Sequence, residues 1–372
     1  MRRRLLFLLA TMLPAPALAQ SCEDRSADFE ARILLCDQAF AAAGTNDDAA
    51  YALAMKGEAQ RLLQRYDEAA ATLQQALNLT PGNAWVWVEL GNVRYDQGDT
   101  AGALASYSAA LSVEDYIDAW ANRAETWWMF RDGQRCSDDA DNALRLDPQY
   151  AYANEIKGRC LIDLGRSDLA LGYFDTAISL APGYQNAYRN KLAALSALGR
   201  YEELVAVADE ALRPGVVTNS SPAIEEDIRA RRLLALAQYA APDVVAAEAE
   251  ALLQLYPQSL AAVNIQAVAL VRAGKAAEAD QLTQTMRANP EGLRLEASYL
   301  DTLAQIDVAL GRLDAAFDNY AAAMNTDPNL SRIYARKLSE LGFLPLSNSP
   351  SGVQTALRRC LDVKKTACTV SI

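Results

Sequence analysis

The chain has few residues of the kinds that perform acid–base or nucleophilic catalysis. It contains no histidine, so neither a Ser-His-Asp triad nor an imidazole base can form. Carboxylate pairs such as Asp138-Asp139 and Glu225-Glu226 are frequent, but most fall where outer faces or loops are expected, which is typical of solvated charge. No glycine-rich phosphate-binding loop of the GxGxxG or GxxxxGKS/T type occurs. We therefore predict a protein that is not an enzyme, with no catalytic residues and no cofactor.

The amino terminus has the layout of a secretory signal. Three arginines at 2–4 precede an apolar run over Leu5–Leu13, and a small-x-small cleavage site follows at 17–19. The apolar run is too short to span a bilayer, which takes about 20 residues. We expect a signal peptide over residues 1–19, export to the periplasm of a Gram-negative bacterium, and no membrane insertion after cleavage. A lipid anchor on Cys22 is the alternative.

The six cysteines are the other residues with reactive side chains. An even number of cysteines in an exported chain indicates disulfides, although the sequence does not select their connectivity. Proximity in the sequence suggests three pairs, Cys22 with Cys36, Cys136 with Cys160, and Cys360 with Cys368. Buried thiols that never react are the alternative for the middle pair. A metal site is not favoured, because no close CxxC pair occurs and histidine is absent.

The composition is that of a folded, acidic protein. Hydrophobic residues make up 51% of the sequence and charged residues 22%, which favours a packed core over disorder. The formal net charge is −12, and loss of the signal arginines would make it more negative. Such a surface repels phosphate backbones and acidic headgroups, so nucleic acid and anionic membranes are excluded as expected partners.

An internal repeat organises the chain. Small residues recur at spacings of 34, 33 and 34 in three columns: Gly57, Gly91, Ala124 and Gly158; Ala69, Ala103, Cys136 and Ala170; and Ala76, Ala110, Ala143 and Ala177. A period near 34 with small residues in fixed columns indicates a helical hairpin stacked on copies of itself, since small side chains let the two helices approach closely.

These residues resemble the tetratricopeptide repeat (TPR) family. The clearest copy has the family's succession of aromatic, Leu-Gly, aromatic, alanine, aromatic and alanine at Trp87, Leu90-Gly91, Tyr95, Ala103, Tyr107 and Ala110. The resemblance implies an all-α fold, a right-handed α-solenoid of stacked helix-turn-helix hairpins. The stretch AWVWVELG from residue 84 is then helical despite its strand-like alternation. Trp87 is expected in the core, and Trp85 is expected to point elsewhere.

The repeat sets the expected organisation of the chain. We predict eight hairpins, over 50–83, 84–116, 117–150, 151–184, 185–213, 225–258, 259–290 and 297–330. The remaining segments are a cap helix within 20–49, a loop over 214–224 that divides repeats 1–5 (50–213) from repeats 6–8 (225–330), and a capping helix and tail over 331–372. One short helix is expected around 352–363 in that tail.

The family resemblance also implies where a partner binds. In a TPR stack the first helix of each repeat lines a concave groove that holds peptides or helices of other proteins. The inward candidates are Tyr51, Glu58, Trp85, Asn92, Tyr95, Asn122, Glu125, Trp128, Tyr152, Arg159, Arg189 and Asn190. Aromatic rings supply apolar area and asparagine can pair with peptide backbone. The alternative is that Trp85 and Trp128 merely add packing between first helices.

A carboxylate clamp of the kind found in some TPR proteins is not expected. Asn92 and Asn122 match its asparagine columns, but Val88, Tyr152 and Ile156 stand where lysine or arginine would be. The sequence thus predicts an exported scaffold that binds partner proteins or peptides, an adaptor in envelope assembly, secretion or proteolysis. The alternative is a self-associating structural subunit of an envelope complex, and the sequence leaves the oligomeric state open.

Overall fold

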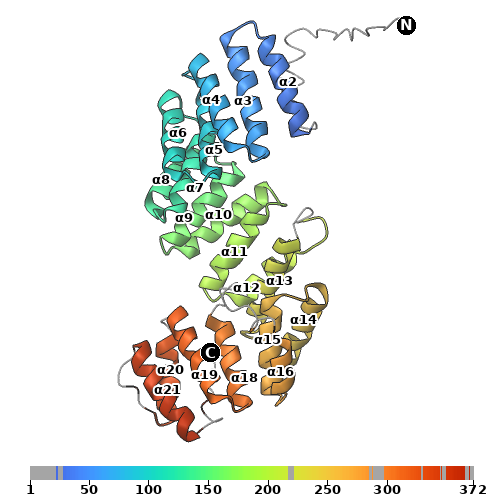
Figure 1. Cartoon of the computed structure of the whole chain (residues 1–372), viewed down its shortest axis with the longest axis vertical. Coiled ribbons are helices and arrows are strands. Elements are labelled where there is room, and N and C mark those ends of the chain that lie inside the picture. Colours follow the sequence, from blue (N-terminus) through green and yellow to red (C-terminus); the bar gives the residue numbers. More distant parts are fainter. Residues whose placement is uncertain are drawn as a thin grey trace, which may run out of the picture. The chain divides into compact units, whose positions relative to one another are not determined.

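The computed structural model describes residues 22–23, 28–216, 222–284, 287, 297–327, 330–343, 345, 349–364 and 368. Over these ranges it contains nineteen α-helices and no strand, so the predicted all-α solenoid of helical hairpins is confirmed (Figure 1). None of the helices in these ranges combines the length and the apolar character needed to cross a bilayer. The predicted signal peptide, residues 1–19, lies outside the described residues.

The chain divides into two compact units, Met1–Leu198 and Gly199–Ile372. We expected the division at the loop 214–224, and it falls earlier because helix α12 (Tyr201–Ala211) packs against helix α13 (Pro222–Leu236) in the second unit. Residues 217–221 of that loop lie outside the described residues.

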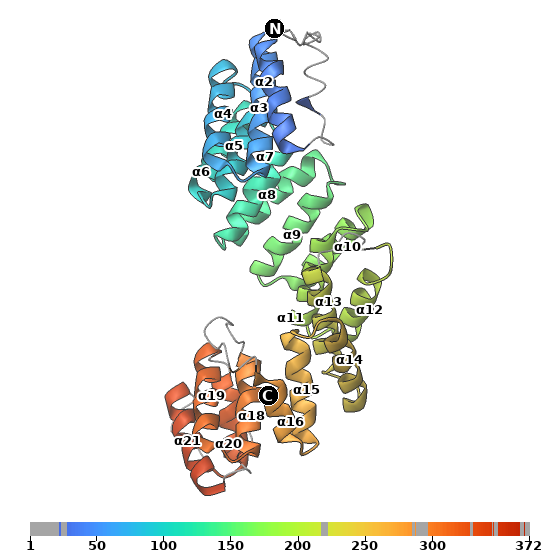
Figure 2. The same cartoon turned by 45° about the vertical axis from the view of Figure 1, so that its right-hand side comes forward.

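The first unit is a cap helix followed by four hairpins and one further helix. Its helices are α2 (Phe29–Ala41), α3 (Asn46–Leu62), α4 (Tyr66–Leu79), α5 (Ala84–Asp96), α6 (Thr100–Val113), α7 (Ile117–Met129), α8 (Gly133–Leu146), α9 (Ala151–Asp163), α10 (Ser167–Leu180) and α11 (Gln185–Ala197). Each helix packs against the next one in the chain, and the first helices α3, α5, α7, α9 and α11 also contact one another in order (Figure 2).

The second unit continues the same architecture. Besides α12 and α13 its helices are α14 (Pro242–Leu255), α15 (Leu260–Arg272), α16 (Ala276–Leu282), α18 (Ala297–Ala309), α19 (Leu313–Thr326), α20 (Leu330–Glu340) and α21 (Pro350–Lys364). Helices α20 and α21 pack on each other and on α19. They cover the last hairpin, which would otherwise leave apolar surface in water.

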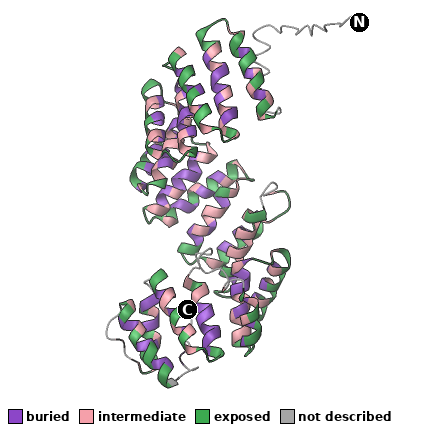
Figure 3. Ribbon diagram, in the orientation of Figure 1, coloured by how far each residue is buried: buried purple, intermediate pink, exposed green. Residues whose placement is uncertain are grey.

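The small-residue columns mark where helices of one hairpin touch. A Cβ atom added at Gly91 would overlap the Tyr107 ring, and one at Gly158 would overlap the Phe174 ring. The alanine columns are fully buried, and Figure 3 shows buried and exposed residues interleaved along each helix. Helix α5 thus forms where the sequence alternates like a strand. Trp87, expected in the core, is half-buried and donates its indole N–H to the Pro81 carbonyl at 3.0 Å.

The turns between paired helices require a left-handed backbone. Gly98 and Gly165 adopt φ of +79° and +71°, which glycine reaches without strain. Gln64 and Arg131 occupy the same place in their hairpins with φ of 60° and 58°. A side chain there costs roughly 1–2 kcal/mol. The first unit therefore carries two mildly strained turns.

The six cysteines form three disulfides in the pairing that sequence proximity suggested. Cys22 bonds to Cys36, Cys136 to Cys160 and Cys360 to Cys368, with Cα atoms 4.9, 5.6 and 5.8 Å apart. A sulfur in a disulfide cannot also carry a thioether-linked lipid, so this arrangement argues against the anchor considered for Cys22.

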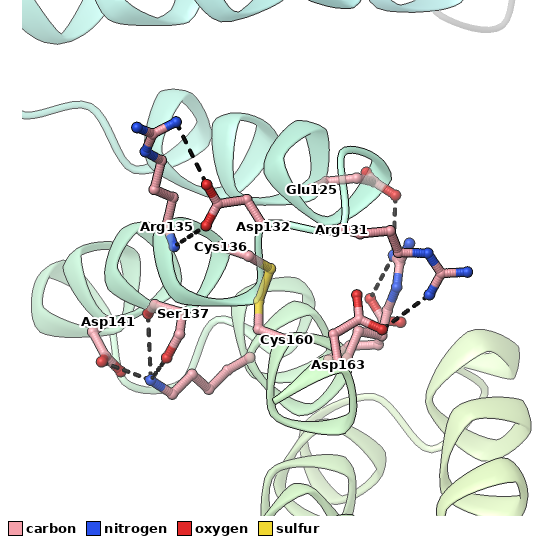
Figure 4. Close-up of a disulfide and its surroundings, with 12 residues drawn as sticks. Glu125, Arg131, Asp132, Arg135, Cys136, Ser137, Asp141, Cys160 and Asp163 are labelled. Carbon is pink, nitrogen blue, oxygen red and sulfur yellow. Dashed lines mark hydrogen bonds and ion pairs between the residues drawn. A yellow bond between two sulfur atoms is a disulfide. The ribbon is translucent and has the colours of Figure 1, made fainter. Parts of the chain in front are cut away.

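The middle disulfide staples one hairpin to the next. Cys136 lies on α8 and Cys160 on α9, and both are fully buried. Figure 4 shows this bond between two ion pairs that join the same two hairpins, Arg131 with Asp163 at 3.0 Å and Lys157 with Asp141 at 2.6 Å. The contact between the third and fourth repeats is thus covalent and ionic as well as apolar.

Candidate partner-binding groove

The twelve candidate residues lie on the first helices α3, α5, α7, α9 and α11 of the first unit, as predicted from the repeat. Most of them bond to one another or to the cap. The structure therefore shows which candidates are used for packing and which line a hollow.

The candidates nearest the amino terminus hold the cap helix in place. The Trp85 ring lies 5.5 Å from the Tyr51 ring and packs on the cluster that contains the first disulfide. The Tyr51 hydroxyl donates to Glu23 at 2.6 Å, and Glu58 accepts from the buried Arg32 at 2.7 Å. Trp85 is half-buried. At this end of the unit Trp85 therefore serves in packing, which was the alternative to a role in partner binding.

A pocket of about 240 Å³ opens at the middle of this row of helices. Its lining comes from α3, α5, α6, α7 and α9 and consists of Arg61, Asn92, Tyr95, Asp96, Tyr107, Asn122, Glu125 and Tyr152. Five of these eight residues are sequence-predicted candidates. The other three are Arg61, Asp96 and Tyr107.

An asparagine forms the floor of the pocket. The Asn92 carbonyl oxygen accepts from the Tyr107 hydroxyl at 2.9 Å and from the Asn122 amide at 2.9 Å. Asn92 donates in turn to Glu89 at 3.3 Å. These bonds tie α5 to α6 and α7, so the amides at the carboxylate-clamp columns are engaged with the protein's own side chains.

Glu125 joins α7 to α9 on one wall of the pocket. It accepts from the Tyr152 hydroxyl and from Arg159 at 3.0 Å. The Arg159 guanidinium lies 3.7 Å from the centre of the Trp128 ring, a close cation–π contact. Trp128 thus serves as a platform for Arg159.

The last candidates surround a buried carboxylate that sequence reasoning missed. Glu155 on α9 is fully buried and accepts from Asn190 at 2.5 Å and from Tyr184 at 3.4 Å. Its other partner is Arg159 at 3.7 Å. Arg189, next to Asn190 on α11, is half-buried.

Burial fixes the protonation states in this region. Burial and the Glu125 charge raise the pKa of Tyr95 to about 12. The same two causes hold the pKa of Tyr152 well above its ordinary value. Burial also raises the pKa of Glu155, against the opposing charge of Arg159. Both phenols therefore keep their protons at neutral pH, and Tyr152 remains a hydrogen-bond donor to Glu125.

The missed lining residues had a signal in the repeat. Arg61, Tyr95 and Trp128 are spaced 34 and 33 apart, so the column that predicts Tyr95 also contains Arg61. Glu155 had no such signal, because the residue at its position one repeat earlier, 34 residues before, is Ala121. Tyr107, an aromatic position of the repeat, is both a fully buried core residue and a wall of the pocket.

Comparison with known proteins agrees with the repeat. A model of the TPR repeat matches residues 57–98, and a model of the tetratricopeptide repeat matches residues 138–185. The chain therefore contains tetratricopeptide repeats over these two segments. Repeats of this family support a role as a protein-interaction scaffold. No curated protein matches the sequence.

Solved structures with the same fold include pilF from Pseudomonas aeruginosa. It is 17% identical with a TM-score of 0.51, and the match covers 60% of this chain and 99% of that one. The Cut9-Hcn1 hetero-tetramer of the APC/C is 12% identical with a TM-score of 0.52, covering 71% of this chain and 49% of that one. At these identities the similarity shows the fold alone.

Proposed function

We propose that this protein is an exported scaffold that binds an extended segment of a partner protein across the first helices of its first unit. The observation that carries the proposal is the pocket shared by α3, α5, α7 and α9. A chain that crosses successive first helices meets the amide of Asn122 and the phenols of Tyr95 and Tyr152 there. Amides and ringed phenols are the groups that hold peptide backbone and side chains in such grooves.

Export is supported by the disulfides and by the predicted signal. Three disulfides persist in oxidising compartments and are rare in the bacterial cytosol. The place of action we propose is the periplasm, with the protein as an adaptor in envelope assembly, secretion or proteolysis. Amino-terminal sequencing of protein from a periplasmic fraction tests this: a first residue near Gln20 supports it, and a chain that retains Arg2–Arg4 in the cytosol contradicts it.

Partner capture from an envelope extract tests the binding surface. The tagged full chain is compared with Asn122→Ala and with Trp128→Ala, which remove an amide of the pocket and the platform under Arg159. The matched control is Leu169→Ala, because Leu169 is an exposed apolar residue on the second helix α10. We expect a partner that is recovered with the parent and the control but depleted with both groove variants.

Equal recovery with all four proteins would show that the groove is not the binding surface. Circular dichroism of each variant establishes that the helices are retained. Light scattering on the parent addresses the alternative of self-assembly: a molecular weight that rises with concentration would favour a structural subunit over an adaptor.

A further inference from the structure

We propose that the pocket on the first-helix face receives a cationic side chain, lysine or arginine, of the partner segment. This inference rests on the proposed function and adds the chemistry of the group that is bound. At about 240 Å³ the pocket is smaller than the roughly 300–1,000 Å³ of ordinary ligand sites, so it suits one side chain better than a whole small molecule.

The phenols around the pocket present acceptors to a ligand. A tyrosine hydroxyl has one proton, and Tyr107 donates its proton to Asn92 while Tyr152 donates to Glu125. The hydroxyl protons of Tyr107 and Tyr152 are therefore used inside the protein, because a carboxylate and an amide oxygen can only accept. What each oxygen still offers is a lone pair, which binds an ammonium or a guanidinium.

The charges of the surrounding helices also favour a cation. Two carboxylates, Asp96 and Glu125, line the pocket against one arginine, Arg61. Over the five first helices α3, α5, α7, α9 and α11, nine acidic residues stand against eight basic residues. The excess is negative, as it is for the chain as a whole at −12. An incoming cation gains from both the near and the distant charges.

The arginine in the wall is already engaged. Arg61 bonds to Asp96 at 2.8 Å and lies 3.9 Å from Glu89. A partner carboxylate that reached for Arg61 would have to displace Asp96 and would face the phenol lone pairs. The pocket therefore disfavours the carboxylate at a peptide's carboxyl terminus, which is the group that a carboxylate clamp binds. Asn92 and Asn122 here belong to a site that favours a cation.

Titration calorimetry with two charged peptides tests the inference on the full chain. The probes are octalysine and octaglutamate at low salt. Asp96→Asn removes a carboxylate from the pocket, Arg61→Gln removes its cation, and Asp138→Asn makes the same charge change as the first variant on an exposed site of α8. A change of about 1.4 kcal/mol in binding corresponds to tenfold in Kd.

We expect octalysine to bind the parent and octaglutamate not to. Asp96→Asn should weaken octalysine binding about tenfold, Arg61→Gln should strengthen it, and Asp138→Asn should change it less than about twofold. Opposite effects of two variants cannot come from unfolding. Octaglutamate binding, equal octalysine affinity in all three variants, or no octalysine binding would overturn the inference. If Asn122→Ala and Trp128→Ala still lose the captured partner when the calorimetry gives one of these results, the proposed function stands and only the preference for a cation is wrong.

Discussion

The first-helix faces of the two units differ in the size of their pockets and in how the asparagines beside those pockets are bonded. In the first unit Asn92, Asn122 and Glu125 bond to neighbouring helices, and the remaining hollow is about 240 Å³. In the second unit a pocket of about 550 Å³ is lined by α13, α14, α15 and α18. The buried carbonyl oxygen of Asn264 at its edge has no hydrogen-bond partner among the described residues.

This difference shows that the repeat can determine a surface of ordered polar side chains in one unit and only the packing of helices in the other. The first unit keeps the glycine and aromatic columns of the repeat, and its polar groups are pre-ordered by one another, which reduces the entropy lost on binding. The second unit keeps buried alanines such as Ala267 and Ala304, and its α18 accepts a bond from Tyr334 at Asp301, but the carbonyl oxygen of Asn264 on α15 has no partner among the described residues. A buried polar atom without a partner costs roughly 1–3 kcal/mol. We therefore place the proposed partner-binding surface on the first unit.

Removal of the disulfides should give the largest difference in stability between the two units. Replacing Cys136 and Cys160 together by alanine should lower the free energy of unfolding of the first unit by about 3 kcal/mol, because the bond closes a segment of 24 residues. Replacing Cys360 and Cys368 should cost the second unit less, about 2 kcal/mol, because its bond closes only 8 residues.

Urea unfolding followed by amide hydrogen exchange resolves the units separately. Equal losses for the two double variants, or a larger loss in the second unit, would contradict the chain-entropy argument. The parent under oxidising conditions is the reference for both.

Two asparagine substitutions should have opposite signs. Asn92→Leu removes the acceptor of Tyr107 and Asn122 and should destabilise the first unit by about 2 kcal/mol. Asn264→Leu removes an oxygen that has no partner in the described part of the chain, and it should stabilise the second unit by about 1 kcal/mol. Thermal unfolding of both variants is the measurement. Destabilisation by Asn264→Leu would mean that this oxygen is satisfied, and the contrast between the faces would fail.

The sequence predicted the fold well because every repeat packs its two helices in the same way. Spacings of 34 and 33 between small residues are enough to locate the hairpins. Helices α4 to α10 fall within the expected windows, whereas α3 begins at Asn46, before the window 50–83. The tail differs in extent: a short helix around 352–363 is expected, and α21 runs over Pro350–Lys364.

The site was harder to predict, because a repeat column gives a residue's face and not its partner. Tyr51 and Trp85 lie on the predicted face, yet they pack on the cap, whose disulfide and helix are outside the repeat. Trp128 is likewise occupied by Arg159. Bonds between successive first helices, such as Asn92 with Asn122, depend on side-chain length and rotamer, which periodicity does not encode.

The turns offer a smaller test of the same contrast. In the second unit Gly274, Gly311 and Gly342 hold the left-handed turn positions, whereas the first unit has Gln64 and Arg131 at two of its turns. Gln64→Gly should therefore stabilise the first unit by about 0.5 kcal/mol, as relief of the left-handed strain exceeds the greater entropy of glycine in the unfolded chain. Gly311→Ala should cost the second unit about 1 kcal/mol. Denaturant midpoints of the two variants check both signs, and a gain from Gly311→Ala would contradict the argument.

The smallest expected effect is a difference in pH dependence. Burial raises the pKa of Glu155 in the first unit, so the folded state holds this proton more tightly than the unfolded chain does. Its contribution to stability is full below the ordinary value of 4.5 and is lost as the pH rises through the raised pKa. In the second unit the bond from Arg312 lowers the pKa of Asp280, whose contribution is present above 3.8 and is lost as the pH falls through the lowered pKa. Mild acid should therefore favour the first unit, and stronger acid should weaken the second.

Hydrogen exchange of each unit between neutral pH and strong acid measures this effect, with one neutralising variant for each group. Glu155→Gln should flatten the first unit's change of stability above pH 4.5, and Asp280→Asn should flatten the second unit's loss in stronger acid, each without altering the other unit's slope. The slope is the informative quantity, because Glu155→Gln also weakens the contact with Arg159 and so lowers stability at every pH. An unchanged slope in the first unit would mean that solvent reaches Glu155, and then the buried and internally bonded character of that face would not hold.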